Sequence, residues 1–299
     1  MSILLMAVSC TLDKTDYENE TNTAVTEHYE FKEAATVTQD HYKISIETLN
    51  GMFYQGYNEM RLKVFNIQTN ENINASEVTF LPVLTKADGS KTSCPYQYTL
   101  NYKPNDRYYS GYSVFTEKSN TVINWKIYLS FTVNQKTYTV HKDITVNEQN
   151  NRNLNMTSFT GNDGEQYYIA LISPQRPAVS ENKLVAGIYR YNKPVAVTGN
   201  FPDPSQFSYS EVKGYTLQLD PRMPEPSMGN HSSPNNKDLI QGNDGLYHGV
   251  VNYTMTGNWT LNFILLNQNG KIIKGTKVST DFTPGVPGTK SELFIDTLF

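Results

Sequence analysis

The sequence predicts an all-β protein built from two tandem β-sandwich domains. Tyrosine is abundant, with 21 among 299 residues, and flat or β-branched side chains pack well on the pleated surface of a sheet. Long runs with the apolar spacing of a helix are missing from the chain. The third observation is an internal repeat, and a chain of this length has room for two domains that each bury a core.

Three short motifs recur in the same order in the two halves of the chain. In the first half, Thr-Ser-Cys-Pro, Tyr-Ser-Gly and Trp-Lys-Ile-Tyr-Leu begin at residues 92, 109 and 125. Their counterparts His-Ser-Ser-Pro, Tyr-His-Gly and Trp-Thr-Leu-Asn-Phe begin at residues 231, 247 and 259. The chain holds no other tryptophan. Three matches in the same order indicate that one domain has been duplicated.

Each half reads as short strands separated by turns. Apolar residues alternate strictly from Ile123 to Val133, as in a strand with one face on a core, and their counterparts are Trp259, Leu261, Phe263 and Leu265. Turn residues follow both, and Gly270 suits the positive φ of such a turn. We expect further strands at residues 59–65, 77–84, 96–102, 108–116, 168–172, 183–191, 214–219 and 246–255. About six or seven strands per half is the pattern of a β-sandwich, with the tryptophan between its sheets.

The expected domain boundaries follow the composition. Residues 1–34 read as a signal remnant and polar tether, residues 35–150 as the first sandwich and residues 165–283 as the second. The polar tract 147–164 is the expected linker, because it is rich in Asn, Thr and Gly. Residues 284–299 form a tail whose apolar end we expect to dock back on the surface.

The N-terminus resembles a bacterial lipoprotein signal. An apolar stretch and small residues precede Cys10, and a polar tract follows it. In that family the chain is cut before the cysteine, so Cys10 would carry the lipid and hold the chain at the membrane. The basic leading segment is absent and the apolar run is short, as a start site placed too far downstream would explain. The alternative is an incidental cysteine. With Cys10 lipidated, Cys94 has no partner for a disulfide.

The net charge of −4 argues against nucleic acid as a partner, because the 25 basic residues are scattered rather than gathered on one face. No apolar run approaches the roughly 20 residues of a membrane-spanning helix.

A proline-rich segment at residues 220–234 differs from an ordinary loop. It brings Met223, Met228 and His231 close in sequence, and His248 and Met255 follow on the next expected strand. Thioether and imidazole groups together favour copper, above all Cu(I), over harder cations. The alternative is that the methionines cap the open rim of the core and that Met255 packs against the nearby tryptophan.

This segment resembles the YtkA-like (FixH-related) domain of bacterial envelope proteins. The resemblance rests on Met-Pro at residue 223, Met-Gly at 228, His-Ser-Ser-Pro at 231, Gly-Leu-Tyr at 245 and Thr-Met-Thr-Gly-Asn-Trp at 254. It implies an immunoglobulin-like sandwich in the periplasm or at the cell surface, with copper handling through Met223, Met228, His231 and Met255. The chain departs from the family where Asn230 separates the glycine from the histidine. The first repeat has Thr92 in the histidine place and lacks the cluster.

Two functions remain, and neither is enzymatic, because no carboxylate pair, nucleophile elbow or phosphate loop is found. The first is a copper-handling accessory module of the envelope. The second is an interaction protein, an adhesin or scaffold with no metal site, that presents tyrosine-rich loops to a protein or glycan. The Met/His cluster discriminates them, because a scaffold has no need for it.

Overall fold

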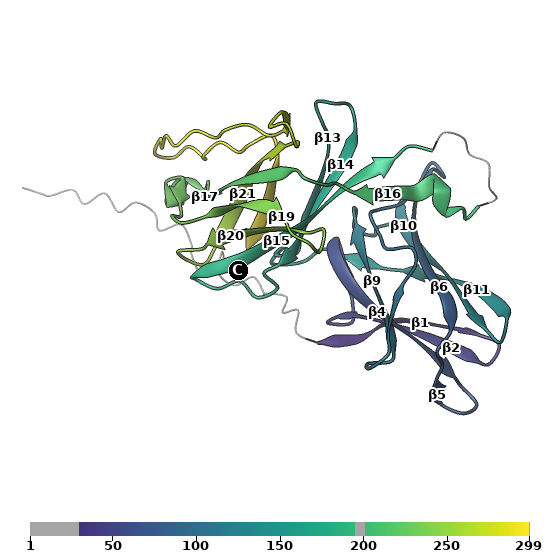
Figure 1. The fold of residues 1–299 in the computed structure, drawn as a ribbon. Coiled ribbons are helices and arrows are strands. Elements are labelled where there is room, and N and C mark those ends of the chain that lie inside the picture. The colour runs from purple at the N-terminus through teal and green to yellow at the C-terminus, as the bar shows by residue number, and fades with distance from the viewer. Residues whose placement is uncertain (1–29, 195–200, 299) are drawn as a thin grey trace, which may run out of the picture.

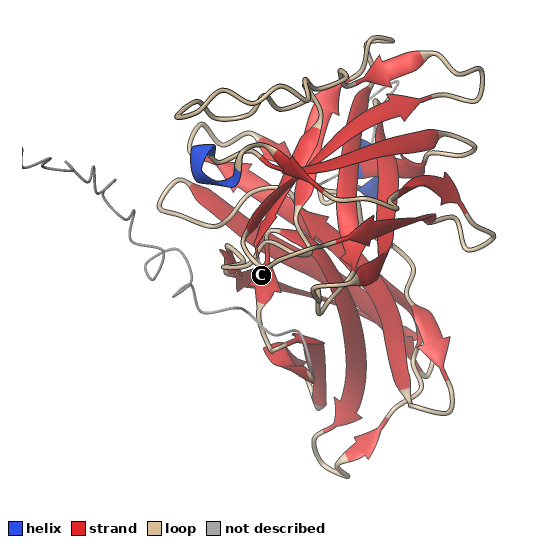
Figure 2. Cartoon of the chain, turned by 90° about the vertical axis from the view of Figure 1, so that its left-hand side faces the viewer, coloured by secondary structure: helices blue, strands red, loops and turns tan. Residues whose placement is uncertain are grey.

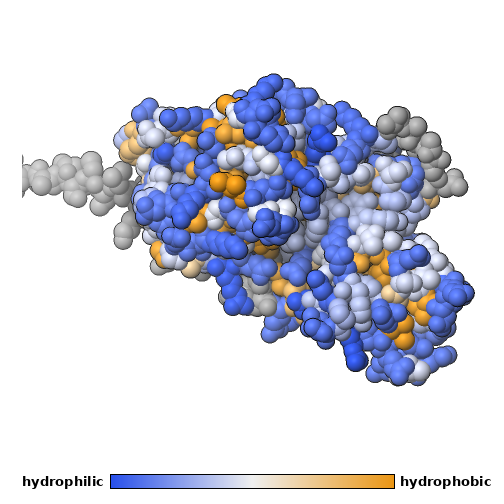
Figure 3. Space-filling model, viewed as in Figure 1, coloured by the Kyte–Doolittle hydropathy of each residue, from blue (hydrophilic) through white to orange (hydrophobic). Residues whose placement is uncertain are grey.

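The part of the chain that the structure describes is all-β, as predicted, with strands as its main regular structure (Figures 1 and 2). The computed structural model describes residues 30–194 and 201–298. Within these ranges the helical elements are two short 3₁₀ turns, η1 (Pro204–Phe207) and η2 (Pro226–Met228). The strands gather in two lobes, formed by residues 31–147 and 156–298. The face seen in Figure 3 is mostly hydrophilic, with apolar side chains in small scattered groups.

The first lobe is a sandwich of two antiparallel sheets. Its strands are β1 (Phe31–Gln39), β2 (Tyr42–Leu49), β3 (Phe53–Tyr54), β4 (Gly56–Asn66), β5 (Glu71–Asn72), β6 (Ser76–Lys86), β7 (Lys91–Thr92), β8 (Asn101–Lys103), β9 (Tyr108–Phe115), β10 (Ile123–Val133), β11 (Lys136–Ile144) and β12 (Val146–Asn147). One sheet has the order β1-β2-β4-β9-β8 and the other β11-β10-β6-β7. The order β2-β4-β9-β8 opposite β6-β10-β11 is that of an immunoglobulin constant-type sandwich.

The second lobe repeats this strand order. Its strands are β13 (Met156–Thr160), β14 (Gln166–Ser173), β15 (Glu181–Asn192), β16 (Ser208–Glu211), β17 (Thr216–Met223), β18 (His231–Ser232), β19 (Lys237–Gln241), β20 (Tyr247–Asn252), β21 (Asn258–Leu266), β22 (Ile272–Lys274) and β23 (Phe294–Leu298). The order β14-β15-β20-β19 corresponds to β2-β4-β9-β8, and β17-β21-β22 corresponds to β6-β10-β11. The hairpin of β13 and β14 also repeats that of β1 and β2. Pairing of β19 with β17 at two positions joins the layers into one sheet.

Each core closes around a tryptophan. Trp125 on β10 and Trp259 on β21 are fully buried. The indole Nε1–H of Trp125 donates to the carbonyl of Glu117 at 2.8 Å, and that of Trp259 donates to the carbonyl of Met255 at 3.1 Å. Both acceptors lie in the connection that precedes the tryptophan strand. The buried indole therefore has its polar group satisfied in the same way in both lobes.

A buried asparagine near the start of β4 and of its counterpart β15 is a further repeat, one that was not predicted from the sequence. The Asn58 Nδ2 group donates to the carbonyls of Tyr54 and Gly56, and its Oδ1 atom accepts from the Tyr54 backbone N–H. Asn182 makes the same three bonds, to the residues four and two positions before it. An isolated asparagine carries no signal of such a clamp, and only the matching register of the two lobes reveals it.

The expected strand at residues 96–102 forms only in part. The chain here bonds alternately to strands of opposite sheets: the Gln97 N–H donates to Tyr112 of β9, and Tyr98 accepts from Phe80 of β6. A segment that crosses from one sheet to the other builds no continuous ladder, so only its end, Asn101–Lys103, is a strand. Other strands were not predicted at all: β1, β2, β13, β16, β19, β23 and the short strands β3, β5, β7, β12, β18 and β22.

The expected polar linker at residues 147–164 is an ordered connection. It includes β13, and its residues Gln149, Asn151, Asn153 and Leu154 are buried. Gln149 Nε2 donates to the carbonyls of Gln55 and Leu154, which ties the connection to the first lobe. Polar side chains of this tract are buried and donate hydrogen bonds to backbone carbonyls. A polar composition therefore does not show that the connection is exposed to solvent.

Tyrosines fill the junction between the lobes. Tyr189 of the second lobe is 2% exposed and lies 5.6 Å from the ring of Tyr112 of the first, which in turn stacks on Tyr57 at 5.8 Å. Nearby, the Tyr209 ring contacts Tyr96 across the junction at 6.3 Å. Part of the tyrosine excess therefore lies between the lobes, where large rings bury much area at low entropic cost.

A strap from the second lobe reinforces this junction. It comprises the described residues 201–207, inserted between β15 and β16 with no counterpart in the first lobe. Phe207 is buried against Leu81 and Val83 on the outer side of β6. The ring of Phe201 meets that of Tyr128 on β10 edge-on at 5.4 Å. The strap covers apolar side chains that the first lobe would otherwise expose.

The C-terminal tail is a strand of the second lobe rather than a surface attachment. Strand β23 pairs with β21 from Asn258 to Asn262, and Leu293 and Ile295 are part of the core. The Leu298 N–H donates to the carbonyl of Asn151, so the tail also holds the connection between the lobes. The first sandwich likewise begins at Phe31, inside the tether expected for residues 1–34.

The junction predicts a large effect of Tyr189→Ala. Removing a fully buried ring leaves a cavity, so we expect the free energy of unfolding to fall by about 3–5 kcal/mol in urea denaturation. Tyr98→Ala, at a ring that is 39% exposed, is the matched control and should change stability by about 0.5 kcal/mol or less. Equal losses in the two variants would contradict a buried junction.

Buried tyrosines of the junction and of the second core predict instability at alkaline pH. Burial, with a smaller contribution from Glu211, raises the pKa of Tyr112 to about 12, and burial raises that of Tyr247 to about 12. The folded state favours the neutral phenol, so its stability is fully present below the unfolded-state pKa of about 10 and is lost as the pH rises toward 12. We expect tyrosinate absorbance to appear together with loss of near-ultraviolet circular dichroism. Complete tyrosine titration near pH 10 with the fold intact would contradict this expectation.

Candidate functional site

The expected metal loop is a strand-turn-strand hairpin at one end of the second lobe. Strand β17 continues to Met223, turns through η2 and returns as β18, where His231 pairs with Met223. The strand passes through Pro221, where a loop was expected. Proline is tolerated here because β19 leaves β17 after Leu217, so that one side of the strand has no ladder to complete.

Met223 is a core residue. It is 2% exposed and belongs to the same apolar cluster as Trp259. Met223 pairs with His231 just as Leu84 pairs with Thr92 in the first lobe, so Met223 occupies the position of a fully buried leucine. A methionine in this place needs no metal to explain it, because apolar packing accounts for both residues.

Three of the expected ligands lie around the same loop end. His231 is half-buried; its Nε2 atom lies 2.9 Å from the Thr254 hydroxyl and its ring centre lies 6.2 Å from that of Trp259. Met255 follows directly after Thr254, in the connection between β20 and β21 rather than on a strand. Met228 and Met255 are both partly buried against the core. Two thioethers and one imidazole are therefore brought to one rim of the sandwich.

His248 does not belong to this group. Its Nε2 atom bonds the carboxylate of Asp244 at 2.9 Å, and this hydrogen bond is the main cause that lowers the pKa of Asp244. His248 pairs with Ile240, which pairs with Thr216 at the far end of β17. Seven residues of strand separate Thr216 from Met223, about 23 Å at 3.3 Å per residue. Sequence proximity alone placed His248 among the expected ligands.

The two residues before His231 form the turn into β18. Gly229 and Asn230 both adopt left-handed conformations, with φ of 61° and 54°. The Asn230 side chain is buried and its Nδ2 group donates to the carbonyls of Ser279 and Asp281. Asparagine suits this position because it tolerates the left-handed region and bonds backbone groups.

A long arm between β22 and β23, residues 275–292, lies along this hairpin. The Gly288 N–H donates to the carbonyl of Pro224 at 2.7 Å, and the Phe282 ring lies beside Gly229. The arm extends from the second lobe as the yellow-green loop of Figure 1. We call the surface formed by residues 224–230, 254–257 and 279–288 the apolar loop end. Its exposed apolar side chains include Phe282 and Val286.

The cysteines have separate positions. Cys94 is a fully buried free thiol, and burial raises its pKa, which disfavours the thiolate that binds metals. Cys10, the expected lipid site, lies outside the described residues.

Among residues 30–194 and 201–298, no three His, Cys, Asp or Glu side chains gather as a metal site. In the same ranges, no helix has the length and apolar character needed to cross a membrane.

Comparison with known proteins gives only distant structural similarity. No family model and no curated protein matches the chain. A DUF4785 family protein from Legionella pneumophila subsp. pneumophila str. Philadelphia 1 is similar at 9% identity and a TM-score of 0.25, over 78% of this chain and 54% of that one. A conserved domain protein from Bacillus anthracis is similar at 13% identity and a TM-score of 0.29, over 83% and 87%. The chain thus spans about half the length of the Legionella protein.

Proposed function

We propose that this chain is a non-enzymatic binding protein of the bacterial cell envelope, whose apolar loop end contacts another envelope protein. The observation that carries the proposal is the exposure of Phe282 and Val286, at 49% and 52%, on an arm whose Phe282 ring lies beside Gly229, next to the half-buried Met228. Aromatic and methionine side chains are enriched in protein interfaces, and methionine adapts to irregular partners.

The attachment of the body to the membrane is part of the proposal. Cys10, preceded by small residues, is the expected lipid site, and a polar tract of about 20 residues separates it from β1 at Phe31. Such a tether lets a folded body reach partners near the membrane. The tyrosine junction supports the role, because a body whose lobes are packed together holds its loops in fixed positions and loses less entropy on binding.

Site-specific photo-crosslinking in intact cells tests the proposal. A photoreactive residue at Phe282 or Val286 should capture the same envelope protein, and one at Ile240, which is 63% exposed on β19, should not. Binding of the purified pair should then weaken about thirtyfold or more in Phe282→Asp, the effect of losing an interface hot spot. Capture of the same proteins from all three positions, or unchanged binding by Phe282→Asp, would contradict the proposed surface.

A second candidate function is copper handling at the same loop end. The observation that favours it is the meeting of Met228, His231 and Met255 at one rim, which supplies two thioethers and one imidazole. This donor set fits Cu(I), a soft cation that binds thioethers. When bound, the ion would be held by these three side chains, and His231 would exchange its bond with Thr254 for the metal.

Titration of the chain from Thr11 onward with Cu(I), against a competing chelator, separates the candidates. Binding of one ion that is lost in a Met228→Ala/His231→Ala/Met255→Ala variant is the result expected of a copper module. Met223→Leu is the matched control. It should keep the affinity for Cu(I) and cost less than about 1.5 kcal/mol of stability, because the swap conserves core volume. No binding, or equal binding by the triple variant, would exclude copper and leave the protein-binding function.

A further inference from the structure

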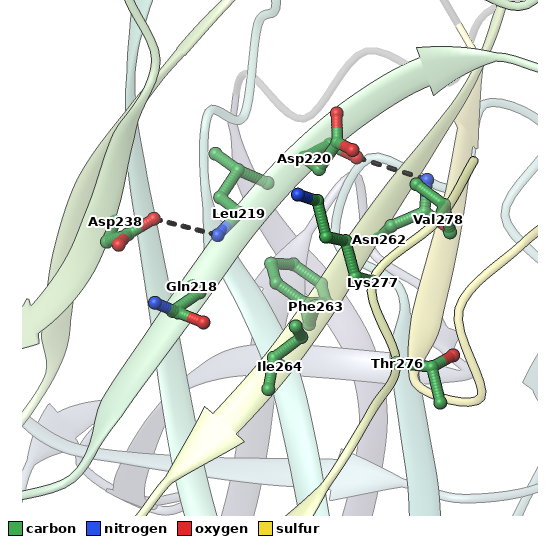
Figure 4. A pocket seen from close by; sticks show the side chains of 10 residues that line it. All are labelled: Gln218, Leu219, Asp220, Asp238, Asn262, Phe263, Ile264, Thr276, Lys277 and Val278. Atoms are coloured by element: carbon green, nitrogen blue, oxygen red, sulfur yellow. Dashed lines mark hydrogen bonds between the residues drawn. The ribbon is translucent and has the colours of Figure 1, made fainter. Parts of the chain in front are cut away.

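A pocket on the outer face of the second lobe lies away from the tip of the arm. It has a volume of about 280 Å³ and lies between β17, β21 and the base of the arm (Figure 4). Gln218 and Asp220 come from β17, Ile264 from β21 and Lys277 from the arm. This volume is near the lower end of the range of small-molecule sites, roughly 300–1,000 Å³, and therefore suits a small ligand.

The fold keeps this pocket open. Strand β19 pairs with β17 only at Thr216 and Leu217, and beyond this point the Asp238 carboxylate accepts from the Leu219 N–H at 2.9 Å in place of a strand. On the other side, Val278 of the arm base is buried and lines the pocket together with Phe263 and Ile264 of β21. Gly275 permits the close approach, because a Cβ atom there would lie 2.2 Å from the carbonyl oxygen of Phe263.

The pocket carries two charges of opposite sign, Asp238 and Lys277, both at exposed residues. Asp220 is neutralised by Arg222, whose Nε atom lies 3.1 Å from both carboxylate oxygens. Asp238 and Lys277 stand on different sides of the pocket, and Lys277 extends from the arm toward β17. Across the described ranges, 30–194 and 201–298, neither of these two charges has an ion-pair partner.

We propose that this pocket binds a zwitterion of dipeptide size with an apolar side chain. Its ammonium group would lie against Asp238, its carboxylate against Lys277 and its side chain on Ile264. The rest of the pocket surface is mainly apolar. A ligand with a charge at each end and an apolar group between them therefore matches both the two charged side chains and the apolar lining. The site is separate from the apolar loop end, and its occupation does not depend on the function proposed above.

Isothermal titration with four probes tests the chemistry. Leucylglycine carries both charges and the apolar group, whereas isopentylamine, 4-methylpentanoate and glycylglycine each lack one of these three features. We expect leucylglycine to bind one to one, and each of the other probes to bind at least about tenfold more weakly. No heat and no saturation with leucylglycine, or equal affinity for isopentylamine, would overturn the proposal.

Three variants locate the binding. Asp238→Asn removes the charge but keeps an oxygen that can accept from Leu219, and Lys277→Gln removes the ammonium; each should weaken leucylglycine binding about tenfold or more. Lys271→Gln, at an exposed lysine in the turn before β22, is the control and should bind as the parent chain does. Retained affinity in Asp238→Asn and Lys277→Gln would show that the dipeptide binds elsewhere and would overturn the assignment. Circular dichroism of each variant confirms that the fold is kept.

Discussion

The burial of one indole ring in each lobe, with its N–H bonded to the preceding connection, is the interaction on which the architecture depends. Trp125 and Trp259 are fully buried, and each lies on an inner strand, β10 between β6 and β11 and β21 between β17 and β22. Cys94 is a free thiol, so these cores are held by packing and by satisfied polar groups such as Asn58 and Asn182. The same plan in both lobes shows that a local hydrogen-bond pattern survives where most residue identities differ.

Much of the fold could be predicted from alternation, and the rest could not for identifiable reasons. The strands that carry Ile123–Val133 and Trp259–Leu265 were found because one face is apolar and the other polar. The burial within residues 147–164 was hidden, because Gln149 and its neighbours bury amide groups against backbone carbonyls, and composition cannot distinguish such a connection from a solvated linker. The junction of Tyr112 and Tyr189 was equally hidden, since a tyrosine on an outer sheet face looks exposed until a second lobe covers it.

The candidate site could be predicted only in part. Met228, His231 and Met255 were grouped from their closeness in sequence, and they lie at one rim because the β17–β18 hairpin and the connection from β20 to β21 meet at the same end of the lobe. Met223 is recognised as a core residue only through its equivalence to Leu84. His248 is excluded from the cluster only by the strand pairing, which places it at the other end of the lobe, where it bonds Asp244. The arm at residues 275–292 carried no periodic signal, yet its Phe282 and Val286 supply the most exposed apolar groups of the loop end.

The strap has a consequence for the order in which the protein matures. Leu81 and Val83 belong to the first lobe, which is complete once β12 ends at Asn147, but their cover, Phe207, lies about 60 residues further along the chain. A first lobe that folds before the strap is in place leaves these apolar groups in water, on the outer side of β6. Exclusion of water from that face therefore waits for the second lobe.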